Sequence, residues 1–231
     1  MSGIMSKPHP GYQQPQVRAC RRTSLGLGLL TCGFIFLIPL LLSGCNVIGA
    51  VAQVVGPPDV QPLYVPEQTP MLVLAEDYSD PSASTVDAEQ LERFLTEELL
   101  AHGVAPIAEC EKVYTLRAAQ PQEYRTKSID QLGRLAGAAQ VLYINLHAGG
   151  TYVGQGAEVY QGRASALVRV VDAETGQTLW PTDAPEGFAL GQDSRLVRAR
   201  PGVTDATVRR DVQRALADQI AKLFYKYKPD S

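Results

Sequence analysis

An apolar run near the amino terminus divides this 231-residue chain into a part suited to a membrane and a part suited to water. Residues 25–42 read LGLGLLTCGFIFLIPLLL and follow Arg18, Arg21 and Arg22. A basic flank before an apolar segment is typical of an export signal, because the charged end stays in the cytoplasm while the apolar helix enters the bilayer. The pattern therefore predicts that the remainder of the chain folds outside the cytoplasm.

The end of this run carries the short motif Leu42-Ser43-Gly44-Cys45. It resembles the lipobox of bacterial lipoproteins, in which a leucine and two small residues precede an obligatory cysteine. The resemblance implies diacylglycerol transfer to the Cys45 thiol and signal cleavage between Gly44 and Cys45, with an uncleaved signal anchor as the alternative. Several acyl chains on one residue give stable membrane anchoring. In enterobacterial lipoproteins, a residue such as Asn46 rather than aspartate after the cysteine implies sorting to the outer membrane, so the resemblance favours that membrane, with the domain facing the periplasm.

Charge and cysteine usage exclude several classes of function. The chain holds 24 acidic and 21 basic residues, and residues 1–44 contain basic residues but no acidic ones. The part after the leader is therefore acidic, which argues against nucleic acid or anionic lipid as a partner. Cys110 is the one cysteine after Cys45, so the sequence predicts no disulfide framework and no Cys-x-x-Cys metal pair.

The chain is predicted to have three parts: a signal peptide over 1–44, a lipidated tether over 45–70, and a single α/β domain over 71–228. Five prolines between positions 57 and 70 are typical of an extended spacer. Beyond them, hydrophobic periodicity predicts strands at 71–75, 104–108, 140–146, 158–171 and 177–180, and helices at 87–103, 128–138 and 205–226. This order, βαβαβββα, predicts an α+β fold: a small mixed sheet of three to five strands with helices packed on one face.

Two segments and the terminal helix together resemble a known group of envelope domains. The segments are SIDQLGRLAGAAQVLYINL at 128–146 and ALVRVVDAETGQTLW at 166–180. The group comprises the curli-secretion lipoproteins, the lipoprotein activators of penicillin-binding proteins, and the amino-terminal domain of the Tol-Pal translocation protein. The resemblance implies a non-enzymatic envelope protein that works through protein contacts. Residues 149–162 are too short for the membrane-inserting hairpins of curli-type pores, because each spanning strand needs about 9–11 residues.

No catalytic or metal-binding set is evident in the sequence. His102 ends a predicted helix and His147 follows a strand, and neither has neighbours at the spacing of a zinc site. No serine or cysteine near His147 has the context of a catalytic nucleophile. The glycine-rich segment 149–156 lacks the Lys-Ser/Thr pair of a phosphate-binding loop. We therefore expect no enzyme activity, no cofactor and no small-molecule substrate.

Aromatic residues are the candidates for partner contact. Tyr152 and Tyr160 flank the glycine-rich loop, and Phe224, Tyr225 and Tyr227 follow the terminal helix. Tyrosine is enriched at interface hot spots. The sequence thus predicts a protein-binding or assembly module whose partner is the membrane, through the lipid, and another envelope protein or a second copy of itself. The alternatives are an oligomeric secretion or transport component and an envelope hydrolase with an unrecognised carboxylate site.

Overall fold

The computed structural model describes residues 58–82, 85–148, 152–153 and 159–229. The chain divides into two units, Met1–Gly56 and Pro57–Ser231, and every described residue belongs to the second. The predicted signal peptide, Cys45 and the bond before it lie outside the described residues. Within the described part, no helix has both the length and the apolar character needed to cross a bilayer.

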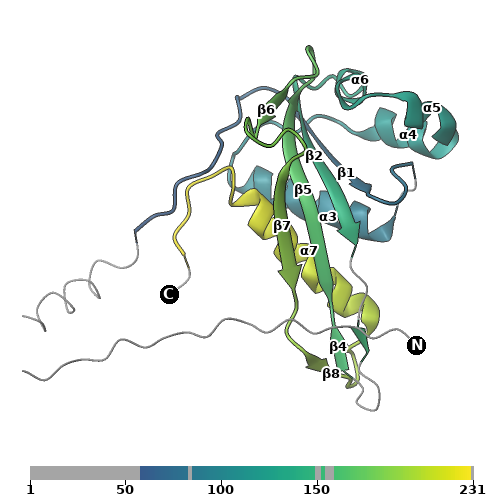
Figure 1. Ribbon diagram of the computed structural model, residues 1–231, viewed down its shortest axis with the longest axis vertical. Helices are drawn as coiled ribbons and strands as arrows, with labels where there is room; N and C mark the ends of the chain where they lie inside the picture. Colours follow the sequence, from purple (N-terminus) through teal and green to yellow (C-terminus); the bar gives the residue numbers. More distant parts are fainter. Residues whose placement is uncertain (1–57, 83–84, 149–151, 154–158, 230–231) are drawn as a thin grey trace, which may run out of the picture. The chain divides into compact units, whose positions relative to one another are not determined.

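A five-stranded mixed sheet forms the centre of the domain (Figure 1). Its strands are β1 (Met71–Asp77), β2 (Gln140–Ala148), β5 (Arg163–Asp172), β6 (Thr178–Trp180) and β7 (Phe188–Asp193). β1 runs parallel to β2, β2 is antiparallel to β5, and β6 and β7 both pair with β5. A second, three-stranded sheet is formed by β3 (Tyr152–Val153), β4 (Val159–Gln161) and β8 (Val197–Arg198).

Helices cover both faces of the central sheet. On one face lie α3 (Val86–Ala101) and α7 (Asp205–Ala221), and on the other lie α4 (Glu111–Ala119), α5 (Pro121–Thr126) and α6 (Ile129–Leu135) (Figure 1). Alternate residues of β1 show this directly, because Val73 joins the core cluster of α3 and α7 while Leu72 and Leu74 join the cluster of α4, α5 and α6. The predicted fold class is confirmed. The expectation that all helices share one face is wrong, since a strand that is apolar on both sides must be covered on both sides.

Several local predictions differ from the structure. The segment 104–108 is not a strand, and only Ile107 forms an isolated bridge, with Met71. α3 begins at Val86 rather than at the predicted residue 87, with Thr85 as its N-cap, whose hydroxyl accepts a hydrogen bond from Ala88 N at 3.2 Å. The stretch 181–202, for which the sequence predicted no helix or strand, contains β7 and β8.

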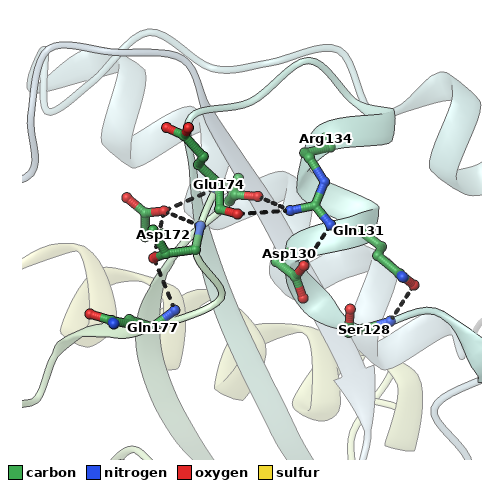
Figure 2. A network of polar contacts seen from close by, with 9 residues as sticks. Ser128, Asp130, Gln131, Arg134, Asp172, Glu174 and Gln177 are labelled. Carbon is green, nitrogen blue, oxygen red and sulfur yellow. Dashed lines mark hydrogen bonds and ion pairs between the residues drawn. The ribbon is translucent and has the colours of Figure 1, made fainter.

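The two segments that carry the family resemblance hold each other in place (Figure 2). Asp172 ends β5, and its Oδ1 accepts hydrogen bonds from Glu174 N at 2.9 Å and Thr175 N at 2.7 Å. From α6, the Arg134 guanidinium reaches this turn and donates to Ala173 O at 2.5 Å. Arg134 also pairs with Asp130 at 2.7 Å, and the Ser128 hydroxyl and Arg134 lower the pKa of Asp130. These polar contacts therefore tie α6 to the turn that follows β5.

Gly133 allows α6 to approach β2 closely. A Cβ at this position would lie 2.5 Å from Val141 Cγ2 and 2.9 Å from Ala173 Cβ. Gly133→Ala is therefore expected to lower the free energy of unfolding by about 1–3 kcal/mol through overpacking, as measured by urea titration. Gly191→Ala is the matched control, because no atom lies within 4 Å of its Cβ position. Equal stabilities of the two variants would contradict this packing.

The proline-rich segment is part of the folded domain from Asp59 onward. Val60 pairs with Tyr227 through hydrogen bonds of 2.8 and 3.2 Å, and Lys226 Nζ lies 2.6 Å from the Asp59 carboxylate. The Tyr64 ring stacks on Trp180 with centroids 6.2 Å apart. Residues just before β1 and residues after α7 therefore lie side by side, as Figure 1 also shows.

Candidate functional site

The aromatic residues singled out in the sequence do not form one site. Tyr160 is half-buried in β4, and the side chain of Tyr152 lies outside the described residues. Phe224 is only 3% exposed and belongs to the core. Tyr225 stacks on His102 at 3.7 Å and meets Tyr227 edge-on at 6.3 Å. Gly162, which follows β4, lies against Val208 and Val212 near the amino end of α7, whereas Tyr225 and Tyr227 follow its carboxyl end, so the two groups lie at opposite ends of this helix.

A groove that the sequence did not predict lies between α3 and α4, beside β1. Its volume is about 670 Å³. Apolar side chains from the three elements and the connecting segment line it, namely Val73, Leu100, Ile107, Ala108 and Ala118. Leu100 is 55% exposed, which is unusual for a leucine beside a core helix face. The groove therefore presents apolar surface to whatever lies outside it.

Three charged residues are buried beside and beneath this groove. Glu76 on β1, Glu92 on α3 and Arg117 on α4 are 6%, 3% and 3% exposed. Glu92 and Arg117 both line the groove. Charged side chains are rarely buried to this degree unless they are paired, because removing a charge from water is costly. The partners of each residue therefore decide what the site can do.

Glu92 protects the free edge of the sheet. At the edge of β1 that faces away from β2, Met71 N donates a hydrogen bond to Pro106 O, and Met71 O accepts one from Ala108 N. Because backbone groups alternate in direction along a strand, the N–H of Ala75, four residues further on, points to the same edge. Glu92 Oε1 accepts from Ala75 N at 2.6 Å. The carboxylate takes the place that a carbonyl of a neighbouring strand would occupy, and such inward-pointing charges are a known protection against edge-to-edge pairing.

The second oxygen of Glu92 accepts from the Tyr114 hydroxyl at 2.5 Å. Both donors to this carboxylate are neutral. Among the described residues, no basic nitrogen lies within 4.0 Å of it, the distance that defines an ion pair. Burial raises the pKa of Glu92, while the hydrogen bonds from Tyr114 and Ala75 and the charge of Arg117 oppose the shift. Glu92 is therefore a hydrogen-bonded but charge-unpaired carboxyl group in the wall of the groove.

Arg117 contacts Glu76 rather than Glu92. Its Nη2 donates to the Tyr124 hydroxyl at 2.7 Å and lies 4.0 Å from Glu76 Oε1. Tyr124 and Tyr143 both donate to Glu76, the latter at 2.8 Å. Burial and the Glu76 charge raise the pKa of both phenols, so they remain protonated donors. Arg117 is thus paired with Glu76 and not with Glu92, and its Nε and Nη1 have no hydrogen-bond partner among the described residues.

The unpaired state of Glu92 predicts a specific pH dependence of stability. The folded-state pKa of Glu92 lies above its ordinary value of 4.5. The protonated carboxyl group therefore makes its full contribution to the free energy of unfolding below pH 4.5. This contribution is lost as the pH rises through the folded-state pKa. Glu92→Gln keeps the shape of the side chain and a carbonyl oxygen that accepts hydrogen bonds, but it removes the negative charge. We expect this variant to unfold at higher urea concentration than the unmodified chain at neutral pH, with the difference closing on acidification. The exposed control Glu186→Gln should leave the pH profile unchanged; a destabilising Glu92→Gln at neutral pH would contradict the assignment.

The remaining reactive residues do not add a catalytic set. Cys110 is a half-buried free thiol that lines the groove. His147 stacks on Tyr78, with the ring centroids 4.1 Å apart. In the ranges that the structure describes, no group of three or more His, Cys, Asp or Glu residues is placed to hold a metal ion. The groove thus combines an apolar wall with the buried carboxyl group of Glu92.

The sequence matches no model of a known protein family and no curated protein. Several similar solved structures are bacterial lipoproteins. Lipoprotein GNA1162 from Neisseria meningitidis is 17% identical, with 66% of this chain and 97% of that chain covered and a TM-score of 0.40. A minor lipoprotein from Acinetobacter baumannii is 14% identical, with 67% of this chain and 90% of that chain covered and a TM-score of 0.40. Another similar structure is the dodecamer of a PelC variant from Paraburkholderia phytofirmans, which is 12% identical, with 72% of this chain and 97% of that chain covered and a TM-score of 0.35. Likeness at this level assigns neither a function nor a site.

Proposed function

We propose that this protein is a lipid-anchored component of the bacterial envelope whose domain binds another envelope protein through the groove between α3 and α4. The groove carries this proposal. Its volume is about 670 Å³, and apolar side chains line it together with a few polar groups, so it can take up side chains of a partner protein. The lipobox resemblance supports the anchor, with Cys45 as the lipidated residue and the outer membrane as the favoured location.

The anchor can be tested by intact mass. The chain extracted from membranes should have the mass of residues 45–231 plus acyl chains, and Cys45→Ala should lose both the processing and the acyl mass. Cys110→Ala is the matched control, because it removes the other cysteine that follows the leader and should leave lipidation unchanged. An unprocessed 231-residue mass for the unmodified chain would replace the lipid anchor with a signal anchor.

The docking surface can be tested with two exposed leucines. Leu100 lies in the groove and is 55% exposed, whereas Leu196 lies between β7 and β8 and is 66% exposed. After crosslinking in envelopes, Leu100→Arg should lose a stoichiometric partner that both Leu196→Arg and the unmodified chain retain. Partner recovery that is equal in the two variants would contradict docking at the groove. If the recovered partner is a second copy of the chain, the oligomeric alternative replaces the proposal.

A further inference from the structure

We propose that the groove recognises a cationic side chain, a lysine ammonium or an arginine guanidinium, carried on an apolar segment of the partner protein and paired with Glu92. This inference rests on the proposed function and names the chemistry of its ligand. It starts from the one buried acidic group in the groove wall that has hydrogen bonds but no counter-charge.

The geometry of Glu92 leaves room for such a partner. A carboxylate offers about four lone-pair sites, and Ala75 N and the Tyr114 hydroxyl are the two donors that reach this one. Both donors are neutral, so among the described residues no ion pair within 4.0 Å offsets the negative charge when the group is ionised. Arg117 does not fill the role, because its guanidinium bonds to Tyr124 and lies beside Glu76. A cation entering the groove would supply the missing charge and a charge-assisted hydrogen bond.

The charge of the surroundings favours the same sign of ligand. Besides Glu92, the groove is lined by Glu89 and Glu97, against Arg93 and Arg117. With Glu76 behind the wall, carboxyl groups outnumber basic groups around the site. An anionic ligand would add to this excess, whereas a cationic one reduces it. Electrostatic complementarity of this kind selects partners and speeds their encounter.

The same observations argue against two other occupants. An added β-strand would need the N–H of Ala75, which Glu92 already occupies. A phospholipid with an ammonium headgroup shares the cationic chemistry, but its phosphate would lie beside the carboxylates of Glu89 and Glu97 at the rim. A basic side chain on an apolar protein segment has no such opposing group. The apolar wall then contacts the neighbours of the basic residue, including its aliphatic stem.

Binding of a cation should be coupled to ionisation of Glu92. The groups that face Glu92 are Tyr114 and Arg117 from α4, Glu89 from α3, and the Ala75 main chain from β1. A bound cation stabilises the charged form of the carboxyl group and releases its proton. Affinity should therefore increase as the pH rises through the pKa of Glu92 in the free protein, and this dependence should be absent in Glu92→Gln.

The probe is a displayed library of random dodecapeptides, selected on the full-length chain in detergent and counter-selected on Leu100→Arg. We expect the enriched peptides to place a lysine or arginine next to apolar residues. Glu92→Gln should weaken their binding about tenfold or more, which corresponds to about 1.4 kcal/mol or more for a charge-assisted hydrogen bond. Replacing the basic residue of the peptide by norleucine should cause a similar loss, and the two losses should not add. Glu123→Gln, an exposed carboxylate outside the groove, is the matched control and should bind normally.

Three outcomes would overturn the inference: no peptide enriched over the counter-selection, enriched peptides without basic residues, or equal affinity for Glu92→Gln. Displacement of the bound peptide by phosphatidylethanolamine vesicles but not by phosphatidylglycerol vesicles would instead assign the site to a lipid ammonium. These failures differ from failure of the proposed function. If Leu100→Arg abolishes partner capture in envelopes while Glu92→Gln does not, the groove docks a protein without a cation.

Discussion

Replacing Arg117 by methionine is expected to lower the free energy of unfolding by about 3–5 kcal/mol, because the buried Glu76 carboxylate loses the one cation that lies within 4.0 Å of it among the described residues. Methionine keeps much of the volume and removes the charge. Glu76 would then face only the hydroxyls of Tyr124 and Tyr143, and the guanidinium that lies over the Tyr124 ring at 4.9 Å would be lost. Urea unfolding followed by circular dichroism measures the effect.

The control for this prediction is Arg125→Met. Arg125 is on the next helix and pairs with Asp80 at 3.0 Å, but about half of its side chain is exposed. Exposed pairs contribute about 0–1 kcal/mol, so this variant should remain close to the unmodified chain. If Arg117→Met were as stable as Arg125→Met, the buried cluster would not be a charged network in the folded protein.

The second large effect is expected for Phe224→Ala, which should lose about 3–5 kcal/mol of unfolding free energy through a cavity in the core. Phe224 is 3% exposed and meets Trp180 edge-on at 5.8 Å and Tyr64 at 6.4 Å. Tyr225→Ala is the matched control, since Tyr225 is half-buried and stacks on His102 at the surface. Thermal unfolding of the two variants is the measurement, and Phe224→Ala should lose more stability than Tyr225→Ala.

Unchanged stability of Phe224→Ala would support the interpretation made from the sequence, in which Phe224 contacts a partner. That interpretation grouped Phe224 with Tyr225 and Tyr227 as partner contacts, on the basis of aromatic residues that follow a helix. A Phe224→Ala chain of unchanged stability that no longer captures a partner would support it. The structure instead predicts loss of stability first, and loss of binding only as a consequence of unfolding.

The strands and long helices were predictable because one physical signal dominates each of them. β5 alternates buried and partly exposed residues along its length, and β1 is a continuous apolar run. α3 and α6 begin after hydroxyl caps and contain apolar residues at helical spacing. β7 was missed because its residues, FALGQD, alternate between partly and fully exposed positions without a buried face.

The groove could not be predicted because its second wall has almost no periodic signal. α4 buries only Val113 and Arg117, and α5 buries only Tyr124. These helices are held by contacts with residues far away in the sequence, such as the bond from Tyr124 to Glu76. One local signal was available: Glu92 follows Leu91 inside the apolar stripe of α3, where a charged residue must either be partnered or serve a function.

The most direct test of the account places a photo-crosslinking amino acid at position 100 of the full-length chain and irradiates intact envelopes. Position 196, an exposed leucine outside the groove, serves as the control. The account predicts one discrete adduct from position 100, absent from position 196 and reduced when Glu92→Gln is introduced. Adducts that are absent from position 100, or equal at both positions, would contradict the claim that the groove between α3 and α4 binds a partner protein.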